Sequence, residues 1–156
     1  MAHRSRKYDS KDIQVRRRTS VPRLLGDCTN LCKDLLLEKL ANRGHHQVGL
    51  SHSVVLRHMD FEGTAQSLIA RRAGVSRQAI AKVVGQLARL GYIRTVRDPH
   101  DRRAKILELT ANGVRLFEDS IEIYDEIERT LSKKIGRQRL VALRSTLQAI
   151  IDGQVL

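Results

Sequence analysis

Apolar residues recur at intervals of three and four along most of the chain, a spacing that predicts a mainly α-helical protein. The first long helix is expected over about 21–44, because Pro22 suits the first turn of a helix and Gly44 suits its end. The chain before this helix differs in character. Residues 1–20 are polar, basic and without an apolar period, and they predict a flexible basic arm.

Three shorter helices are expected in the middle of the chain, each marked by a residue suited to its start or end. One begins near Ser51, and the next has Thr64 as its N-cap and ends at Gly74, which suits a left-handed conformation. The third has Ser76 as its N-cap and ends at Gly91, and its apolar face consists of Ile80, Val83, Val84, Leu87 and Leu90. Two helices joined by a glycine-containing turn are typical of a helix-turn-helix.

A β hairpin and two further helices are expected to complete the chain. Residue types and turn signals predict strands over 92–96 and 105–109, joined by an Asp-Pro-His-Asp turn. Thr110 can cap a long helix that Gly136 interrupts, and a last helix ends at Gly153. The long helix has apolar residues at steps that approach a heptad seam, namely Val114, Phe117, Ile121, Tyr124, Ile127, Leu131 and Ile135.

The predicted fold class is mainly α with a small β wing. A winged helix-turn-helix is expected at about 50–110, within a domain covering 21–152. The helices at about 21–44 and 110–152 are expected to serve dimerisation, because the seam and the apolar last helix offer more hydrophobic surface than a small winged core covers by itself. The alternative for these helices is a bundle within one chain.

The excess of positive charge lies in two stretches of the 156-residue chain, whose net charge is +12. Residues 1–23 hold eight basic and two acidic residues, and residues 71–105 hold ten basic and two acidic ones. The second stretch covers the end of the helix-turn-helix and the hairpin, and this localisation favours a polyanion as partner. Aromatic residues make up only 3% of the chain, which disfavours single-stranded nucleic acid and leaves double-stranded DNA.

The helix predicted after the glycine turn carries side chains suited to reading DNA. One α-helix fits the major groove, and residues near its N-terminus meet the base edges. Arg77 matches guanine and Gln78 matches adenine, and the full set of expected contacts on this helix is Ser76, Arg77, Gln78, Ala81 and Lys82. At the wing tip, Arg102 and Arg103 are expected to enter the minor groove. Asp101 either orients the neighbouring guanidinium or only shapes the turn.

The stretch GVSRQAIAKVVGQLARLGYIRTVRDPHDRRAKILELTANG, residues 74–113, resembles the MarR family of bacterial winged helix-turn-helix regulators. Its most specific part is DPHDRRAKILELT, with the wing Asp-x-Arg formed by Asp101 and Arg103. The resemblance extends over roughly 24–152, and Gly85 departs from the polar residue usual in the family. It implies a homodimer whose first and last two helices interlock and whose winged domains read a palindromic operator, with repression as the expected outcome.

The resemblance also implies regulation by a small molecule or an oxidant. A ligand pocket between the dimerisation helices and the winged domain would involve Leu35, His52 and Leu56. Cys28 and Cys32 lie one helical turn apart, which is too far for an undistorted disulfide. Some members of the family sense oxidants through a cysteine near the first helix, and the alternative is that both cysteines are buried small apolar residues.

The sequence contains no motif of an enzyme or a metal site, so we expect neither catalysis nor a metal nor a cofactor. The six histidines are expected on the surface or in loops, and the acidic residues of the long helix are expected on a solvated face. No signal segment or membrane span is expected, and two cysteines fit a reducing, cytoplasmic setting. The alternative to DNA binding is a winged-helix module that docks an acidic protein without selecting a DNA sequence.

Overall fold

The structure is a computed structural model that describes residues 8–97 and 105–153. The chain forms two compact units, Met1–Leu35 and Leu36–Leu156. In the first unit lie α1 (Ser10–Thr19) and most of α2 (Val21–Asn42), which begins beside Pro22 as expected.

Helix α1 lies within residues 1–20, for which the sequence predicts a flexible basic arm and no helix. Asp9 caps it by accepting a hydrogen bond from the Asp12 N–H at 2.7 Å, and three arginines occupy its last turn. A carboxylate at the start and cations at the end both stabilise the helix, because they interact favourably with its dipole. The sequence did not indicate this helix because it has no apolar period, and α1 has a cap and favourable charges at its ends but no buried residue.

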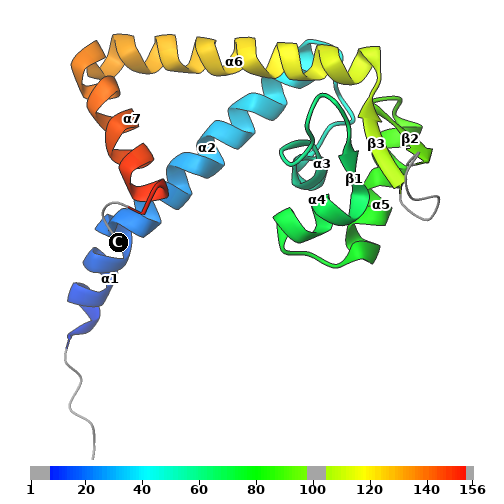
Figure 1. Ribbon diagram of the computed structural model, residues 1–156. Coiled ribbons are helices and arrows are strands. Elements are labelled where there is room, and N and C mark those ends of the chain that lie inside the picture. Colours follow the sequence, from blue (N-terminus) through cyan, green and yellow to red (C-terminus); the bar gives the residue numbers. More distant parts are fainter. Residues whose placement is uncertain (1–7, 98–104, 154–156) are drawn as a thin grey trace, which may run out of the picture. The chain divides into compact units, whose positions relative to one another are not determined.

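The second unit contains the helices of a helix-turn-helix in the predicted order (Figure 1). These are α3 (Leu50–Leu56), α4 (Gln66–Ala73) and α5 (Arg77–Arg89). Gly74 ends α4 with a φ of 64°, the left-handed conformation predicted for it. Ser76 then caps α5, because its Oγ accepts a hydrogen bond from the Ala79 N–H at 3.1 Å.

The sheet has three antiparallel strands in the order β1–β3–β2. Its hairpin, β2 (Ile93–Arg97) and β3 (Lys105–Leu109), lies where the sequence predicts a wing. Residues 98–104, which include the turn between these strands, lie outside the described residues. The third strand, β1 (Thr64–Ala65), was not predicted.

Strand β1 corrects the prediction that Thr64 caps a helix. Thr64 pairs with Leu107 of β3, and α4 starts only after Ala65. The Thr64 hydroxyl accepts a hydrogen bond from the Asp60 N–H at 2.7 Å, so it closes the preceding turn instead of capping α4. A β-branched residue that is locally suited to an N-cap also suits a strand, and pairing with a distant strand decides between the two.

Two further helices follow the sheet, α6 (Ala111–Ile135) and α7 (Arg137–Ile151). The predicted cap of α6 is present, since the Thr110 Oγ1 accepts a hydrogen bond from the Gly113 N–H at 3.1 Å. Gly136 separates the two helices with a φ of 87°. Both boundaries agree with the sequence-based expectation.

The core of the second unit draws on the end of α2, on α3, α4 and α5, on the sheet and on α6. From α6 it takes Leu116 and Ile123, which are not among the seven positions of the predicted seam. Of that seam, Ile121 is 58% exposed and Tyr124 is 49% exposed. Helix α6 therefore has two apolar faces, one buried within the chain and one on its surface.

Candidate nucleic-acid interface

Helix α5 separates buried apolar side chains from exposed polar ones. Ile80, Val84 and Leu87 belong to the core, at intervals of four and three that place them on one side of the helix. The residues of this helix and its cap that are predicted to contact DNA are exposed on the remaining surface. We refer to them together as the α5 surface: Ser76, Arg77, Gln78, Ala81 and Lys82. The structure thus brings these five predicted residues together in the first two turns of one helix.

The α5 surface is positively charged, because α4, α5 and the turn between them contain no acidic residue. Among the described residues, none forms an ion pair with Arg77 or Lys82, whereas Arg72 of α4 is bonded to Asp60 at 2.8 Å. That hydrogen bond holds the pKa of the Asp60 carboxyl below its usual range. The charge of Arg72 is therefore compensated within the chain, and the charges of Arg77 and Lys82 face solvent.

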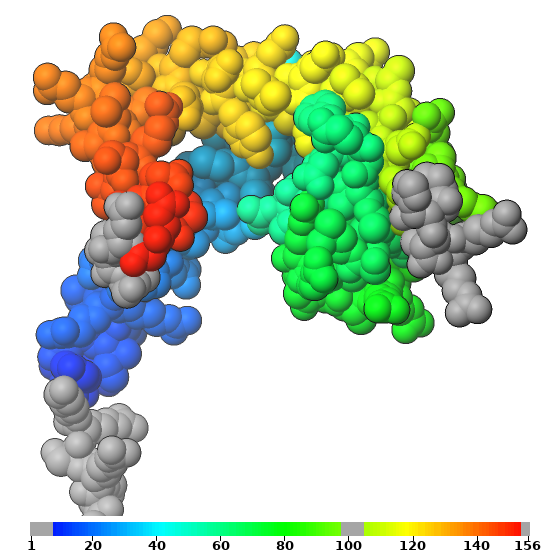
Figure 2. All heavy atoms as spheres, in the orientation of Figure 1, coloured from blue at the N-terminus to red at the C-terminus, as the bar shows by residue number. Residues whose placement is uncertain are grey.

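A groove of about 380 Å³ lies beside the start of α5. It is lined by Ser67, Leu68, Ala70, Arg71, Val75 and Arg77. In the views of Figures 1 and 2, α4 and the turn to α5 form the end of the second unit that lies opposite α6. Helix α6 therefore leaves the α5 surface and the groove uncovered.

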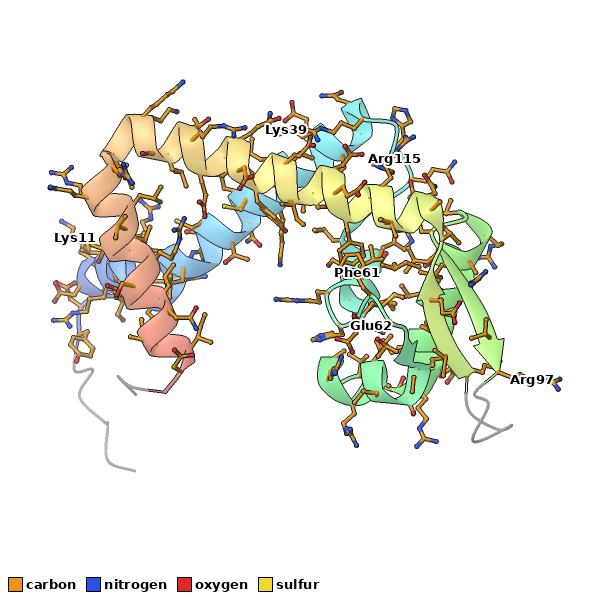
Figure 3. The ribbon with its side chains drawn as sticks, turned by 45° about the horizontal axis from the view of Figure 1, so that its top comes forward. Lys11, Lys39, Phe61, Glu62, Arg97 and Arg115 are labelled. Atoms are coloured by element: carbon orange, nitrogen blue, oxygen red, sulfur yellow. The ribbon has the colours of Figure 1, made fainter. Side chains whose placement is uncertain are left out.

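The wing begins next to α5 and adds further cations. Arg97 is exposed at the end of β2 and projects into solvent (Figure 3). Arg94 of the same strand is paired with Glu108 of β3 at 2.7 Å, so its charge is compensated. The predicted wing-tip residues Asp101, Arg102 and Arg103 lie outside the described residues.

The residues predicted for a ligand pocket belong to different units of the chain. His52 and Leu56 belong to α3 of the second unit, and Leu35 belongs to the first unit. His52 is only 8% exposed, which corrects the expectation of a surface histidine. Its Nδ1 accepts a hydrogen bond from the Gly49 N–H at 2.9 Å, and burial lowers its pKa. A neutral ring at the start of α3 has a structural role in holding that turn.

The two cysteines are free thiols, with Cys28 exposed and Cys32 half-buried. Within residues 8–97 and 105–153, no three histidine, cysteine or acidic side chains group in a way that could hold a metal ion. Across the same residues, every helix is too short or too polar to span a lipid bilayer.

A buried polar cluster connects three elements of the second unit, and sequence reasoning missed it. His45 is 1% exposed, with its ring between the Tyr92 hydroxyl and the Asp119 carboxylate. Asp119 also accepts a hydrogen bond from Arg43 at 3.0 Å. His45 lies in the loop between α2 and α3, within the expectation of a surface or loop histidine, but its side chain is buried. The expectation of a solvated Asp119 is wrong, because its carboxylate is half-buried against His45 and Arg43.

The ion pairs continue along α6. Arg43 is also bonded to Glu122 and Glu126 at 2.7 Å, and Lys39 reaches Glu126 at 2.7 Å. Positions 119, 122 and 126 follow helical spacing and lie on one face of α6. That spacing, opposite a basic C-terminal turn of α2, is the signal in the sequence that indicates this cluster.

Comparisons with known proteins agree with this architecture. A family model described as "MarR family" matches residues 46–104, which include α3, α4, α5 and β2. The HTH-type transcriptional regulator FarR of Neisseria gonorrhoeae is 25% identical over 79 residues, covering 51% of this chain and 54% of FarR. The chain is matched over about half the length of such curated relatives.

Solved structures match over nearly the whole chain. The crystal structure of MarR superposes with a TM-score of 0.71 at 21% identity, covering 87% of this chain and 98% of that one. CouR from Rhodococcus jostii RHA1, bound to p-coumaroyl-CoA, gives a TM-score of 0.63 at 25% identity over 85% and 92% of the two chains. A MarR family model thus matches the part of the chain that holds the helix-turn-helix, and the fold is similar to that of solved MarR-family transcriptional regulators.

Proposed function

We propose that this protein is a transcriptional regulator that binds double-stranded DNA in a sequence-specific manner. The observation that carries the proposal is the α5 surface, on which Arg77 and Lys82 lie exposed without an ion-pair partner among the described residues. A helix with one face in the core and a cationic face in solvent fits the major groove, which is about 12 Å wide. The exposed start of α5 also adds the positive end of its dipole.

Each residue of the α5 surface has a distinct proposed role. Arg77 binds guanine O6 and N7, and Gln78 binds adenine N6 and N7. Ser76 and Lys82 hold phosphate, while Ala81 allows the helix to approach the base edges closely. Arg97 of β2 extends the contact along the phosphate backbone of the DNA.

The wing completes the proposed interface. Arg102 and Arg103 enter the minor groove, where a narrow A·T-rich stretch concentrates negative potential. Asp101 orients the guanidinium of Arg103. These three roles rest on the sequence motif and on the family.

The regulator acts as a homodimer on a palindromic operator. Support comes from the exposed apolar residues Ile121 and Tyr124 on α6 and Val141 and Leu143 on α7, which a second copy would cover. Two-fold symmetry would place the two α5 helices about 34 Å, or one turn of DNA, apart. A dimer on such a site excludes other proteins from the duplex, and we therefore propose repression.

A small organic ligand relieves repression. The support is the structural similarity to CouR, which carries p-coumaroyl-CoA. The ligand of this chain is assigned only by class, and Leu35, His52 and Leu56 are the residues proposed to contact it. Oxidation of the exposed Cys28 is the alternative trigger, with Cys32 as its neighbour. Adding ligand candidates or peroxide to the operator-bound protein distinguishes the two.

Selection of duplexes from a random library tests the proposal. The full chain is expected to enrich one palindromic sequence, and Arg77→Ala is expected to weaken binding to it about 5–150-fold, the range of one bidentate base contact. Raising the salt concentration from about 50 mM to about 200 mM is expected to lower the affinity for DNA about 10³-fold if six phosphates are contacted.

The matched control is Lys134→Ala, which removes an exposed cation from α6 instead of α5. It is expected to bind the selected duplex as the unsubstituted protein does. An unenriched library, or equal losses for Arg77→Ala and Lys134→Ala, contradicts the proposal. Binding of an acidic protein without any enrichment of DNA would identify a docking module.

A further inference from the structure

The buried His45 joins two segments that lie far apart in the sequence. Its Nδ1 lies 2.8 Å from the Tyr92 Oη, and its Nε2 lies 2.9 Å from the Asp119 Oδ2. Tyr92 follows α5 and immediately precedes β2, while Asp119 belongs to α6. We name these three residues the Tyr92–His45–Asp119 chain. It connects the segment between α5 and the wing with the long helix.

The chemistry of Asp119 fixes the direction of its hydrogen bond with His45. The hydrogen bond from His45, followed by that from Arg43, holds the pKa of Asp119 below its usual range, so this carboxylate only accepts. Nε2 of His45 therefore carries the proton that Asp119 accepts. Burial raises the pKa of Tyr92, so its hydroxyl keeps its proton beside Nδ1 of His45.

The backbone of Tyr92 is held as firmly as its side chain. Its N–H donates to the Leu87 carbonyl of α5 at 3.0 Å, and its carbonyl accepts from the Thr110 N–H at 3.1 Å. The Thr110 hydroxyl donates to the Gly91 carbonyl at 2.5 Å. Gly113 of α6 approaches so closely that an added Cβ would lie 2.1 Å from the Tyr92 oxygen. Tyr92 is therefore fixed to α5 and to the start of α6.

We propose that the Tyr92–His45–Asp119 chain positions α5 and the wing relative to α6, and thereby sets the half-site spacing that the dimer accepts. The inference rests on the proposed function. Apolar contacts alone can slide, whereas two directional hydrogen bonds in a buried site permit one arrangement. Because α6 carries the proposed dimer face, the direction of α5 relative to α6 determines the separation of the two recognition surfaces. Tyr92, His45 and Asp119 are positioning residues, since none of them is placed on the DNA.

The test compares duplexes that differ only in the spacing of their half-sites. The full chain first selects its operator, and its affinity is then measured for that duplex and for versions with one base pair inserted or deleted at the centre. The unsubstituted protein is expected to prefer its own spacing at least tenfold. Tyr92→Phe, which removes one hydroxyl, is expected to bring that ratio below threefold.

Two variants of Asp119 show whether the hydrogen bond itself is needed. Asp119→Asn keeps an oxygen that accepts from His45 Nε2–H, so it is expected to keep the spacing preference. Asp119→Ala removes the acceptor and is expected to lose the preference as Tyr92→Phe does. The control is Ile123→Val, which loosens the core next to α6 without removing a hydrogen bond and is expected to keep the preference.

The outcomes separate this inference from the proposed function. If the unsubstituted protein enriches no sequence, the proposed function fails and the inference fails with it. If it enriches an operator and Tyr92→Phe keeps the full spacing ratio, the inference alone is overturned. Equal loss of the ratio in Ile123→Val also overturns it, because general loosening would then explain the effect.

Discussion

Gly113 shows how closely α6 approaches the segment between α5 and the wing. A Cβ at this position would lie 2.1 Å from the Tyr92 carbonyl oxygen and 3.2 Å from the Leu109 side chain. The oxygen belongs to the backbone and already accepts a hydrogen bond from the Thr110 N–H, so it has little freedom to move. The absence of a side chain at Gly113 is thus a requirement of packing, in a helix where alanine would otherwise be preferred.

Gly113→Ala is therefore expected to destabilise the protein, by about 1–3 kcal/mol as overpacking in a core does. Gly85→Ala is the matched control, because its added Cβ would meet only an Arg89 guanidinium atom at 3.7 Å. Alanine in the middle of α5 is expected to stabilise by about 0.5–1 kcal/mol. Urea unfolding of both variants checks the opposite signs. A loss of stability in both, or in neither, would contradict the packing argument.

Asp119 contributes stability that depends on pH. Hydrogen bonds from His45 and Arg43 hold its pKa in the folded protein below its usual value. A lowered carboxyl pKa adds stability above the unfolded pKa of about 4, and this contribution is lost as the pH falls through the folded pKa. Asp119→Asn is expected to lower the free energy of unfolding at pH 7, and the two proteins are expected to converge towards pH 2. A difference that is constant with pH would contradict the prediction.

At the scale of elements, the start of α5 combines a structural and a proposed functional role in Ser76. Its Oγ caps the helix, and it lies exposed beside Arg77. The groove next to it is lined by Arg71 and Arg77. A substitution that keeps the cap and changes the charge therefore separates the two roles.

Ser76→Ala is expected to cost about 1 kcal/mol of stability through loss of the N-cap. Ser76→Asp keeps the cap and is expected to retain the stability of the unsubstituted protein. Its carboxylate would repel phosphate, so operator binding by Ser76→Asp is expected to fall at least tenfold. Thermal unfolding and a DNA titration measure the two effects. Tight operator binding by Ser76→Asp would remove Ser76 from the proposed interface.

At the scale of the whole molecule, the two apolar faces of α6 differ in burial. Leu116 and Ile123 pack within the chain, while Ile121 and Tyr124 lie on the surface. Val141 and Leu143 of α7 add further exposed apolar surface. A single chain leaves this surface in water, which is the observation behind the proposed homodimer.

Ile121→Glu is expected to dissociate the dimer, because a buried carboxylate without a partner is costly. Sedimentation is expected to show a monomer with unchanged helical content by circular dichroism. Ile123→Ala is the contrasting variant, because its side chain is buried within the chain, and it is expected to lose about 2–5 kcal/mol of stability. A dimeric Ile121→Glu protein would place the interface elsewhere.

The sequence by itself determined the order of the helices from α2 onward and of the hairpin strands, and it placed several of their ends, but it did not predict α1 or β1. Gly74, Ser76 and Thr110 act through neighbours three or four residues away, so their roles can be predicted without knowledge of the fold. The segregation of apolar and basic positions on α5 is local in the same sense. The family resemblance rests on these short-range features and on the wing motif.

Only the tertiary structure decided which of two locally acceptable states each ambiguous residue adopts. Thr64 suits a cap or a strand, and pairing with Leu107 makes it a strand. His45 and Asp119 are residue types that each suit the surface. In the fold His45 is buried and Asp119 half-buried, because His45 Nε2 and Asp119 Oδ2 are brought to 2.9 Å. The same holds for α6, whose spacing permits two apolar faces. The energies that decide between the two states come from contacts between residues far apart in the sequence. A local sequence pattern carries no information about those contacts.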